Sequence, residues 1–305
     1  DRRQEHHPLR FPLPLRMKRI LITGGSGFVG RHVLPELEKR GFEVIAPSSA
    51  EMDVLDPASV SSSIRRIAPT HVLHFAWIAT PGVYQESPDN ERWKDASLHL
   101  FREAIAHGVK RIVGVGSCFE YTWPDTPCVE DSTPSDAATT LYGRMKNACK
   151  DELMALAQKH GISAAWGRIF FLYGPGEPAK KLIASVITSL LRGEQALCTH
   201  GRQIRDFAYV KDVASAFAAL CDSDVHGPVN VASGEVIALK DLIMTAARVI
   251  GAEENVKLGA REVPPNEPPV ITADVTKLLS TGWKRAYTHK EALRETVAWW
   301  KERLT

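Results

Sequence analysis

Residues 18–30 read Lys-Arg-Ile-Leu-Ile-Thr-Gly-Gly-Ser-Gly-Phe-Val-Gly, and this stretch decides the fold of the chain. The short apolar run 20–22 is typical of a strand buried in a parallel sheet. Apolar residues then recur at helical spacing from Val29 to Leu37. The stretch therefore predicts a strand, a tight turn and the start of a helix in immediate succession.

The glycines of the turn have the spacing Gly-x-x-Gly-x-x-Gly. Gly24 allows the turn, Gly27 lets phosphates approach the backbone, and Gly30 lets the helix lie close to the strand. The free N–H groups and the dipole of the helix start can hold a pyrophosphate. We therefore predict a dinucleotide-binding turn that includes Phe28 and Val29, with a purely structural turn as the alternative.

Composition limits the possible classes of protein. A chain of 305 residues with 44% hydrophobic and 24% charged residues can form one large domain or two lobes. The net charge of +2 and the absence of a basic stripe with interleaved aromatics argue against nucleic-acid binding. No apolar run approaches the roughly 20 residues that span a bilayer, and the five cysteines lack metal-ligand spacing. We predict a cytoplasmic protein without a metal site or a membrane partner.

Predicted helices and strands alternate along the first half of the chain, which favours a doubly wound parallel sheet of the α/β class. Residues 1–16 show neither period, and we exclude them as a leader, an expression remnant or a mis-set start that is expected to be disordered. The predicted elements are helix 30–40, strand 42–46, helix 57–68, strand 71–76, helix 91–107, strand 111–115, a helix from about 141 to 160, helices 180–192 and 213–221, strand 229–231, and helices 239–250 and 290–303.

The end of strand 42–46 bears on the choice of coenzyme. An acidic residue there would accept hydrogen bonds from the adenosine ribose and repel a 2′-phosphate. Only small hydroxyl residues such as Ser48 follow this strand, and no arginine is present at the tip. Asp53 and Asp56 come later, where an acidic side chain could instead face the adenine amino group, and Val54 beside Asp53 is a further cofactor-side candidate. We therefore predict NADP in preference to NAD.

Ligands bind at the carboxyl edge of such sheets, so the residues that follow strand 71–76 are further candidates. His74 lies on this strand, where a packed and hydrogen-bonded histidine is more usual than a catalytic base. The candidates are Phe75, Ala76 and Trp77 on the cofactor side, and Tyr84 in the loop 81–90 toward the substrate.

Tyr142 and Lys146 lie four residues apart on a predicted helix and therefore share one face. An ammonium beside a phenol favours the phenolate and lowers a pKa that is ordinarily about 10. Such a tyrosine can exchange a proton near neutrality. A surface Tyr-Lys pair is the alternative, but Ser117 at the end of the preceding strand supports a catalytic group.

Together these motifs resemble the extended short-chain dehydrogenase/reductase family, in its nucleotide-sugar epimerase/dehydratase branch. The resemblance extends from Met17 to the C-terminus. The matching segments are Thr23 to Gly30, Ser117 with Tyr121, Tyr142 with Lys146, Arg168 to Pro175, and Arg205 to Val213.

The resemblance implies a role for each of these residues. Tyr142 would be the general acid or base at a sugar carbonyl or hydroxyl, and Lys146 would hold the nicotinamide ribose and depress the tyrosine pKa. Ser117 would hydrogen-bond the reacting oxygen. Arg205 would face the diphosphate of a nucleotide sugar, with a surface salt bridge as the alternative. The remaining substrate-side assignments are Cys118, Phe119, Phe171 and Lys181.

Departures from the family pattern narrow the reaction. Sugar dehydratases place Asp-Glu directly after the catalytic threonine, whereas this chain has Cys118 and Phe119 there, although Glu120 follows. Dehydration is therefore not expected. Phe171 replaces an asparagine of many relatives, and Trp77 replaces a small residue. The pattern looks more like a subgroup of deoxysugar 4-ketoreductases, and Cys118 is better explained as a buried filler than as a nucleophile.

The resulting hypothesis is an enzyme with two parts. A Rossmann-type NAD(P)-binding domain spans 17–173, with 203–233 returning to it, and a smaller α/β substrate lobe spans mainly 174–305. We expect an NAD(P)-dependent reductase of a nucleotide-linked 4-keto sugar, and a homodimer formed through helices 91–107 and 141–160. The alternatives are a nucleotide-sugar 4-epimerase with tightly bound NAD and a non-catalytic NAD(P)-sensing binding protein.

Overall fold

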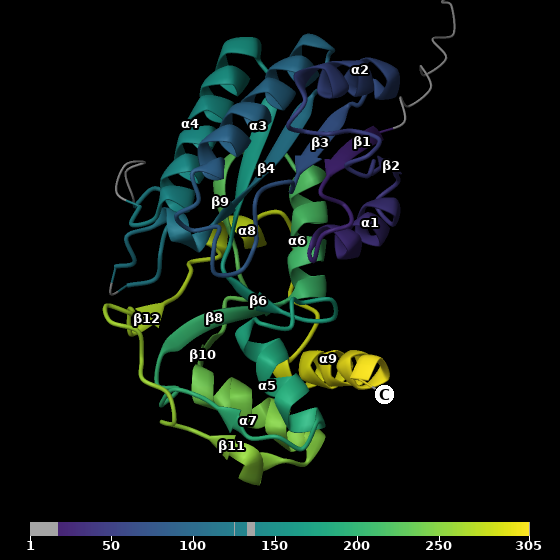
Figure 1. Ribbon diagram of the computed structural model, residues 1–305. Coiled ribbons are helices and arrows are strands. Elements are labelled where there is room, and N and C mark those ends of the chain that lie inside the picture. Colours follow the sequence, from purple (N-terminus) through teal and green to yellow (C-terminus); the bar gives the residue numbers. More distant parts are fainter. Residues whose placement is uncertain (1–17, 125, 133–137, 305) are drawn as a thin grey trace, which may run out of the picture.

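The computed structural model describes residues 18–124, 126–132 and 138–304. The predicted leader 1–16 lies outside the described residues. The described chain forms two lobes, each around its own sheet, with the larger sheet above the smaller one in Figure 1.

The larger sheet is parallel throughout and has the strand order β2-β1-β3-β4-β5-β9. The predicted doubly wound parallel sheet is therefore confirmed. The chain leaves β1 toward β2 on one side and returns to β3 on the other. Parallel sheets bind ligands at such a reversal, outside the carboxyl ends of the strands. The strands are β1 (Lys18–Thr23), β2 (Phe42–Ile45), β3 (His71–His74), β4 (Arg111–Ser117), β5 (Ser163–Ile169) and β9 (Gly227–Val231).

Helices cover both faces of this sheet (Figure 1). Helices α1 (Gly30–Glu38) and α6 (Val210–Cys221) pack on one face, where they enclose Ile20 and Ile22 of β1. Leu21 points to the other face, which carries α2 (Pro57–Ile67), α3 (Asp89–Ala106) and α4 (Leu141–His160). Because both faces are buried, the consecutive residues Ile20, Leu21 and Ile22 in the middle of β1 are apolar, as the sequence predicted.

The helix that carries the Tyr-Lys pair has clear end signals. The Thr140 hydroxyl accepts a hydrogen bond from the N–H of Gly143 at 3.1 Å and caps the start of α4. Gly161 ends the helix in the left-handed conformation, with φ of 63°. The two caps fix where α4 begins and ends, and the cap at Thr140 places Tyr142 in the first turn of the helix.

The smaller lobe is built around β8, which pairs in parallel with β6 and β12 and antiparallel with β10. A separate parallel pair joins β7 and β11. Three helices pack against the central strands of this lobe. Its elements are β6 (Phe171–Tyr173), α5 (Leu182–Leu191), β7 (Ala196–Leu197), β8 (Ile204–Tyr209), β10 (Val236–Ala238), α7 (Leu239–Ile250), β11 (Val256–Lys257), β12 (Val270–Ile271) and α9 (His289–Leu304). Three short helices complete the part of the chain that the structure describes: η1 (Cys118–Glu120), η2 (Glu253–Asn255) and α8 (Thr276–Leu279).

The structure shifts the predicted limits of the first domain. Strand β6 was assigned to it, and the return was expected from residue 203, but β6 and β8 both belong to the smaller sheet. The return to the larger sheet begins only with α6 at Val210. The reason is packing, since Phe207 and Tyr209 of β8 lie in the apolar core shared with α5, α7 and α9.

The other predicted elements agree with the structure to within three residues at either end. Strands β5 and β8 were not predicted. Each carries a buried charged residue inside the strand, Arg168 in β5 and Asp206 in β8, which hides the apolar pattern.

Candidate functional site

The glycine turn after β1 has the close approaches that its spacing predicted. Gly24 has φ of 71°, and a Cβ there would lie 2.8 Å from the N of Ala76. A Cβ on Gly30 would lie 2.2 Å from the carbonyl oxygen of Gly24, so only glycine allows α1 to start against the turn. Gly27 donates its N–H to the same carbonyl at 3.0 Å.

The start of α1 fits the diphosphate of a dinucleotide. No side chain caps this helix and its first turn carries no acidic residue, which suits an anionic group at its N–H groups. Arg31 lies over the turn and donates to the carbonyl oxygens of Ser26 and Gly27. Phe28 and Val29 are partly buried and pack toward the core of the smaller lobe.

The tip of β2 differs from its prediction. Ser48 was expected to offer a hydroxyl without an acidic neighbour, but the carboxylate of Glu51 accepts from both the N–H and the hydroxyl of Ser48, each at 2.8 Å. A negative charge therefore lies at the tip, because the chain turns back after the strand. Asp53 is exposed and accepts from the N–H of Leu55 at 2.9 Å, and Val54 is buried.

His74 is packed and hydrogen-bonded, as expected. Its Nδ1 pairs with the Thr23 hydroxyl at 2.6 Å and its Nε2 with the Ser97 hydroxyl at 2.7 Å. Burial lowers the pKa of His74 to about 3, so the imidazole is neutral at physiological pH. The residue joins β1, β3 and α3 and has no free nitrogen for base catalysis.

Lys146 is buried beneath the carboxyl end of β4. Its Nζ donates to the carbonyl oxygen of Val115 at 2.7 Å and lies 3.8 Å from the ring centroid of Trp77. Trp77 is held in turn by Asn90, whose Oδ1 accepts from the indole N–H at 2.8 Å. Burial lowers the pKa of Lys146 to about 8.

Tyr142 lies between the loop after β3 and the end of β4. Its N–H donates to the carbonyl oxygen of Gln85 at 2.9 Å, and its ring meets the ring of Tyr84 edge to face at 4.9 Å between centroids. The Ser117 side chain lies close enough to the Tyr142 hydroxyl to lower its pKa. The structure therefore brings Ser117, Tyr142 and Tyr84 together.

The expected direction of the Tyr142 pKa is wrong for this structure. Burial, followed by the neighbouring Tyr84 and Glu120, raises the pKa of Tyr142, and the Ser117 side chain opposes this rise without reversing it. Lys146 does not reverse the shift either, because its ammonium is bound to the Val115 carbonyl and lies 5.7 Å from the centre of the Tyr142 ring. Tyr142 is therefore a protonated phenol in this state.

Ser117 ends β4 and starts η1. Its hydroxyl accepts from the N–H of Phe119 at 3.3 Å, and its own N–H donates to Glu120 Oε1 at 2.9 Å. Cys118 is 2% exposed, and burial raises the pKa of its thiol to about 12, so it is a buried filler without a nucleophilic thiolate. Its side chain is not offered to a substrate, whereas Phe119 is partly exposed beside Tyr142.

Arg205 is bound to the proline-rich loop 264–269 of the smaller lobe. The guanidinium donates to Glu267 and to the carbonyl oxygens of Pro268 and Pro269, and its side chain is 3% exposed. It lies 5.5 Å from the ring centroid of Phe171. Arg205 forms a salt bridge in this state, as in the alternative interpretation, but the guanidinium is buried and not on the surface.

Lys181 lies on the Tyr84 side of the site, with its Nζ 5.6 Å from the ring centroid of Tyr84. It immediately precedes α5. The segment before it, 174–177, was not assigned a role from the sequence, but it contacts the glycine turn. The carbonyl oxygen of Pro175 accepts from His32 Nε2 at 2.9 Å, and Gly176 lies against Arg31. This segment therefore joins the cofactor side to the smaller lobe.

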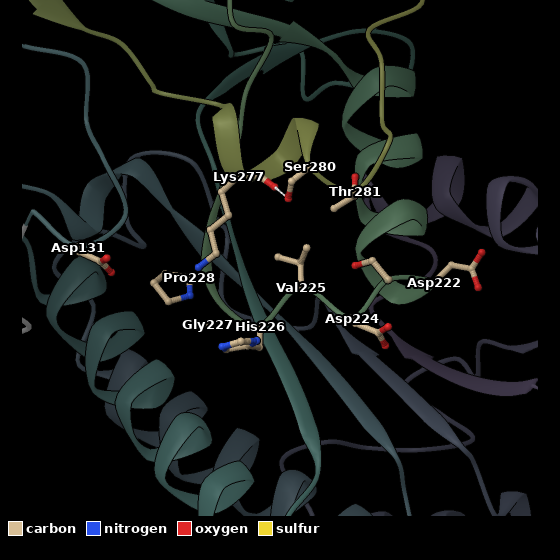
Figure 2. A pocket seen from close by; sticks show the side chains of 11 residues that line it. Asp131, Asp222, Asp224, Val225, His226, Gly227, Pro228, Lys277, Ser280 and Thr281 are labelled. Carbon is tan, nitrogen blue, oxygen red and sulfur yellow. Dashed lines mark hydrogen bonds between the residues drawn. The ribbon is translucent and has the colours of Figure 1, made fainter.

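Figure 2 shows a surface cavity of about 800 Å³ that lies elsewhere. It surrounds the amino end of β9, where the side chain of Lys277 extends toward Pro228 between Asp131 and Asp224. Because the strands are parallel, this is the edge opposite the carboxyl end of β4. The cavity is therefore separate from the residues described above.

Two further features concern the part of the chain that the structure describes. No group of three or more His, Cys, Asp or Glu side chains in it is arranged to hold a metal ion. None of its helices is long and apolar enough to cross a membrane.

Comparison with known proteins gives a consistent set of relatives. Residues 20–232 match the model of the NAD dependent epimerase/dehydratase family. GDP-L-fucose synthase 1 of Arabidopsis thaliana is 26% identical over 303 residues, which cover 92% of this chain and 93% of that protein. The UDP-glucose 4-epimerase of Thermus thermophilus, solved with NAD, is 25% identical, with a TM-score of 0.80 over 93% of this chain and 99% of that one. RMD from Pseudomonas aeruginosa, solved with NADPH, is 25% identical, with a TM-score of 0.80 over 94% and 99% of the two chains.

Proposed function

This chain belongs to the NAD-dependent epimerase/dehydratase family, and from that premise we propose that it reduces a nucleotide-linked 4-keto sugar to the hydroxyl. It is an enzyme of the extended short-chain dehydrogenase/reductase type that uses a nicotinamide dinucleotide. The observation that carries the proposal is that the side chains of Ser117 and Tyr142 lie next to each other, with Lys146 one turn further along α4.

The bound reduced nicotinamide would supply a hydride to the carbonyl carbon. Negative charge then develops on the sugar oxygen, which the hydroxyls of Ser117 and Tyr142 stabilise by hydrogen bonding. Tyr142 gives its proton to that oxygen and completes the hydroxyl group. The raised pKa of Tyr142 suits this role, because the phenol holds its proton until the oxygen becomes basic. Lys146 would hold the ribose next to the nicotinamide.

The position of Glu120 argues against dehydration. An acid that removes a sugar hydroxyl must reach the cleft, but Glu120 is fully buried. Its Oε1 accepts from Ser117 and Trp166, and its Oε2 accepts from Arg168. Glu120 therefore does not take the place of the Asp-Glu pair of the sugar dehydratases.

A nucleotide-sugar 4-epimerase with tightly bound NAD is the second candidate. The observation that favours it is the Glu51 carboxylate at the tip of β2, which would repel the 2′-phosphate of NADP. The preference for NADP expected from the sequence is therefore a proposal that Glu51 opposes. A 4-epimerase would interconvert hydroxyl epimers without net consumption of coenzyme.

The remaining parts of the proposal concern surroundings and assembly. The nucleotide sugar would lie between Tyr84, Phe119, Phe171 and Lys181, and Arg205 would approach its diphosphate only if it leaves Glu267. We place the enzyme in the cytoplasm and expect a homodimer formed by α3 and α4, which pack side by side on one face of the larger sheet (Figure 1). Light scattering after size exclusion measures the oligomeric state.

One experiment separates the candidates. Purified enzyme is mixed with NADPH or NADH and the 4-keto-6-deoxy forms of UDP, dTDP, GDP and CDP sugars, and absorbance at 340 nm is followed. Stoichiometric oxidation of the coenzyme supports the reductase. Interconversion of 4-hydroxyl epimers without oxidation supports the 4-epimerase. Coenzyme binding without turnover of any sugar, together with an inert Tyr142→Phe substitution, supports a binding protein.

A further inference from the structure

Glu120 and Arg168 form an ion pair that is wholly buried behind the proposed catalytic residues. Arg168 Nε donates to Glu120 Oε2 at 2.7 Å, and neither side chain is exposed. Gly116 makes room for the carboxylate, because a Cβ there would lie 2.1 Å from Glu120 Oε1. The indole N–H of Trp166 donates to the same oxygen at 2.9 Å.

Stability alone does not explain such a pair. Moving two charges out of water costs free energy, and well-packed apolar residues of similar volume are often as stable or more stable. A buried pair with many directed hydrogen bonds fixes the positions of the groups that it contacts. Those groups therefore indicate its role.

The hydrogen bonds of the pair reach both elements that carry the proposed catalytic residues. Glu120 Oε1 accepts from the N–H of Ser117 at 2.9 Å, at the end of β4. The carbonyl oxygen of Glu120 accepts from Asn147 Nδ2 at 2.9 Å, and Arg168 donates to Asn147 Oδ1 at 3.3 Å. Asn147 directly follows Lys146 on α4, so the pair sets the spacing between β4 and α4.

The carboxylate also faces the titrating groups of the site. Burial raises the pKa of Tyr142 and lowers that of Lys146, and the charge of Glu120 acts to raise both. Among the described residues that contribute to these two shifts, Glu120 is the one carboxylate. The other groups that face Tyr142 are Ser117, Cys118 and Tyr84, and those that face Lys146 are His74, Cys149, Trp77 and Trp166.

We propose that the Glu120–Arg168 pair is a positioning device that holds Ser117 in register with Tyr142 and Lys146 and presents a fixed negative charge to them. The inference rests on the proposed function, since it concerns the same three residues. Glu120 acts through its neighbours, because burial keeps it from contact with any ligand. Its substitution therefore alters turnover and ionisation more than substrate affinity.

Glu120→Gln tests the charge while keeping the shape of the side chain and an acceptor for Ser117. Asp212→Asn is the matched control, because Asp212 is a carboxylate with 1% exposure that accepts from the N–H of Ala286 at 2.8 Å, on α6 and away from the site. The first readout needs no substrate. The tryptophan fluorescence of the protein is measured as a function of pH. The same measurement on a Trp77→Phe variant is subtracted, which leaves the signal of Trp77, the residue whose indole lies over Lys146.

In the unmodified protein we expect the Trp77 signal to change with a midpoint near pH 8, when Lys146 loses its proton. Glu120→Gln should move this midpoint to lower pH by about half a unit or more, because the ammonium loses an attractive charge. Asp212→Asn should leave it unchanged. An unshifted midpoint in folded Glu120→Gln overturns the electrostatic part of the inference.

The second readout is turnover of the 4-keto-6-deoxy nucleotide sugar. For Glu120→Gln we expect kcat to fall about tenfold with KM within twofold, and the alkaline limb of the kcat profile to move to lower pH. Unchanged kcat and an unchanged pH profile overturn the positioning role. Arg168→Lys serves if Glu120→Gln does not fold, since it keeps the charge but loses the contact with Asn147. We then expect a fall in kcat of fivefold or more with the Trp77 midpoint retained, and wild-type kcat overturns the inference.

Tyr142→Phe, measured in parallel, separates this inference from the proposed function. Full turnover by Tyr142→Phe refutes the proposed function, and the Trp77 titration then tests the inference by itself. An inactive Tyr142→Phe with an unaltered Glu120→Gln refutes the positioning inference alone.

Discussion

Lys146 Nζ lies 3.8 Å from the ring centroid of Trp77 and has the carbonyl oxygen of Val115 as its hydrogen-bond acceptor at 2.7 Å. Both partners are neutral, so neither cancels the charge of the ammonium. An indole face attracts a cation, and the attraction is larger when water is excluded. The lysine is therefore held in place beside Tyr142 with its charge available to a ligand.

The ionisation of Lys146 makes stability depend on pH. Its pKa falls from 10.5 to about 8 in the fold, so the unfolded chain binds the proton more tightly. The free-energy cost of burying the Lys146 ammonium is fully present below about pH 8. It disappears as the pH rises from about 8 to about 10.5, so stability increases over this range. We expect Lys146→Met to be more stable than the unmodified protein at pH 7 by about 1–3 kcal/mol, and the difference to shrink by pH 9.5.

Urea unfolding at the two pH values measures this difference. Lys159→Met, at the exposed end of the same helix, is the control and should show no such pH dependence. A Lys146→Met protein that is destabilised equally at both pH values would show that the charge of the lysine is not the source.

Tyr142 is expected to supply the proton of the reaction. Tyr142→Phe keeps the ring against Tyr84 but removes the hydroxyl that lies beside Ser117. General acid catalysis is commonly worth 10²- to 10⁴-fold, so kcat should fall by about that factor with coenzyme affinity retained. Coenzyme oxidation and fluorescence titration measure the two quantities. Tyr287→Phe in the smaller lobe is the matched control and should keep full turnover.

Glu51 is expected to control the choice between the two coenzymes. Its carboxylate is hydrogen-bonded to Ser48 at the tip of β2, where the 2′-phosphate of NADP would lie. Glu51→Gln removes one negative charge and should raise the ratio of kcat/KM for NADPH to that for NADH by about tenfold. Glu38→Gln, an exposed residue of α1, should leave the ratio unchanged. Equal ratios in the Glu51→Gln and unmodified enzymes would show that Glu51 does not face the bound coenzyme.

Gly30 is expected to be essential for both the turn and coenzyme binding. Gly30→Ala would place a Cβ 2.2 Å from a carbonyl oxygen, so the helix must move away from β1. We expect a loss of about 2 kcal/mol or more in stability and a weaker affinity for NADH. Gly41→Ala meets nothing within 4 Å and should cost only about 1 kcal/mol of left-handed strain with NADH affinity kept. Thermal unfolding and fluorescence titration distinguish the two.

Local patterns made much of the site predictable from the sequence. The residues of the glycine turn are contiguous in the sequence, and Tyr142 and Lys146 lie on one face because they are four residues apart on a helix. Both arrangements therefore depend only on residues that are close together in the chain. The packed state of His74 followed from its place in a buried strand. The interactions that could not be predicted from the sequence depend on the register of the strands or on the paths of the loops.

The Glu120–Arg168 pair shows why the rest was out of reach. Gly116 and Arg168 are register partners of β4 and β5, which brings the guanidinium over the glycine to the carboxylate 48 residues away in sequence. Strand β5 itself was not predicted, so its register was unknown. Arg205 likewise meets Glu267 because of the path of the proline-rich loop, for which the sequence offered no pattern.

The hydrogen bond between His32 and Pro175 connects helix α1, which follows the glycine turn, to the segment 174–177 that precedes α5. A ligand that orders one of these two segments also partly orders the other. The second ligand then loses less conformational entropy when it binds, so coenzyme and sugar nucleotide should bind cooperatively. Thermodynamic reciprocity then requires each to tighten the other by the same factor, a symmetry that calorimetric titrations in both orders would reveal.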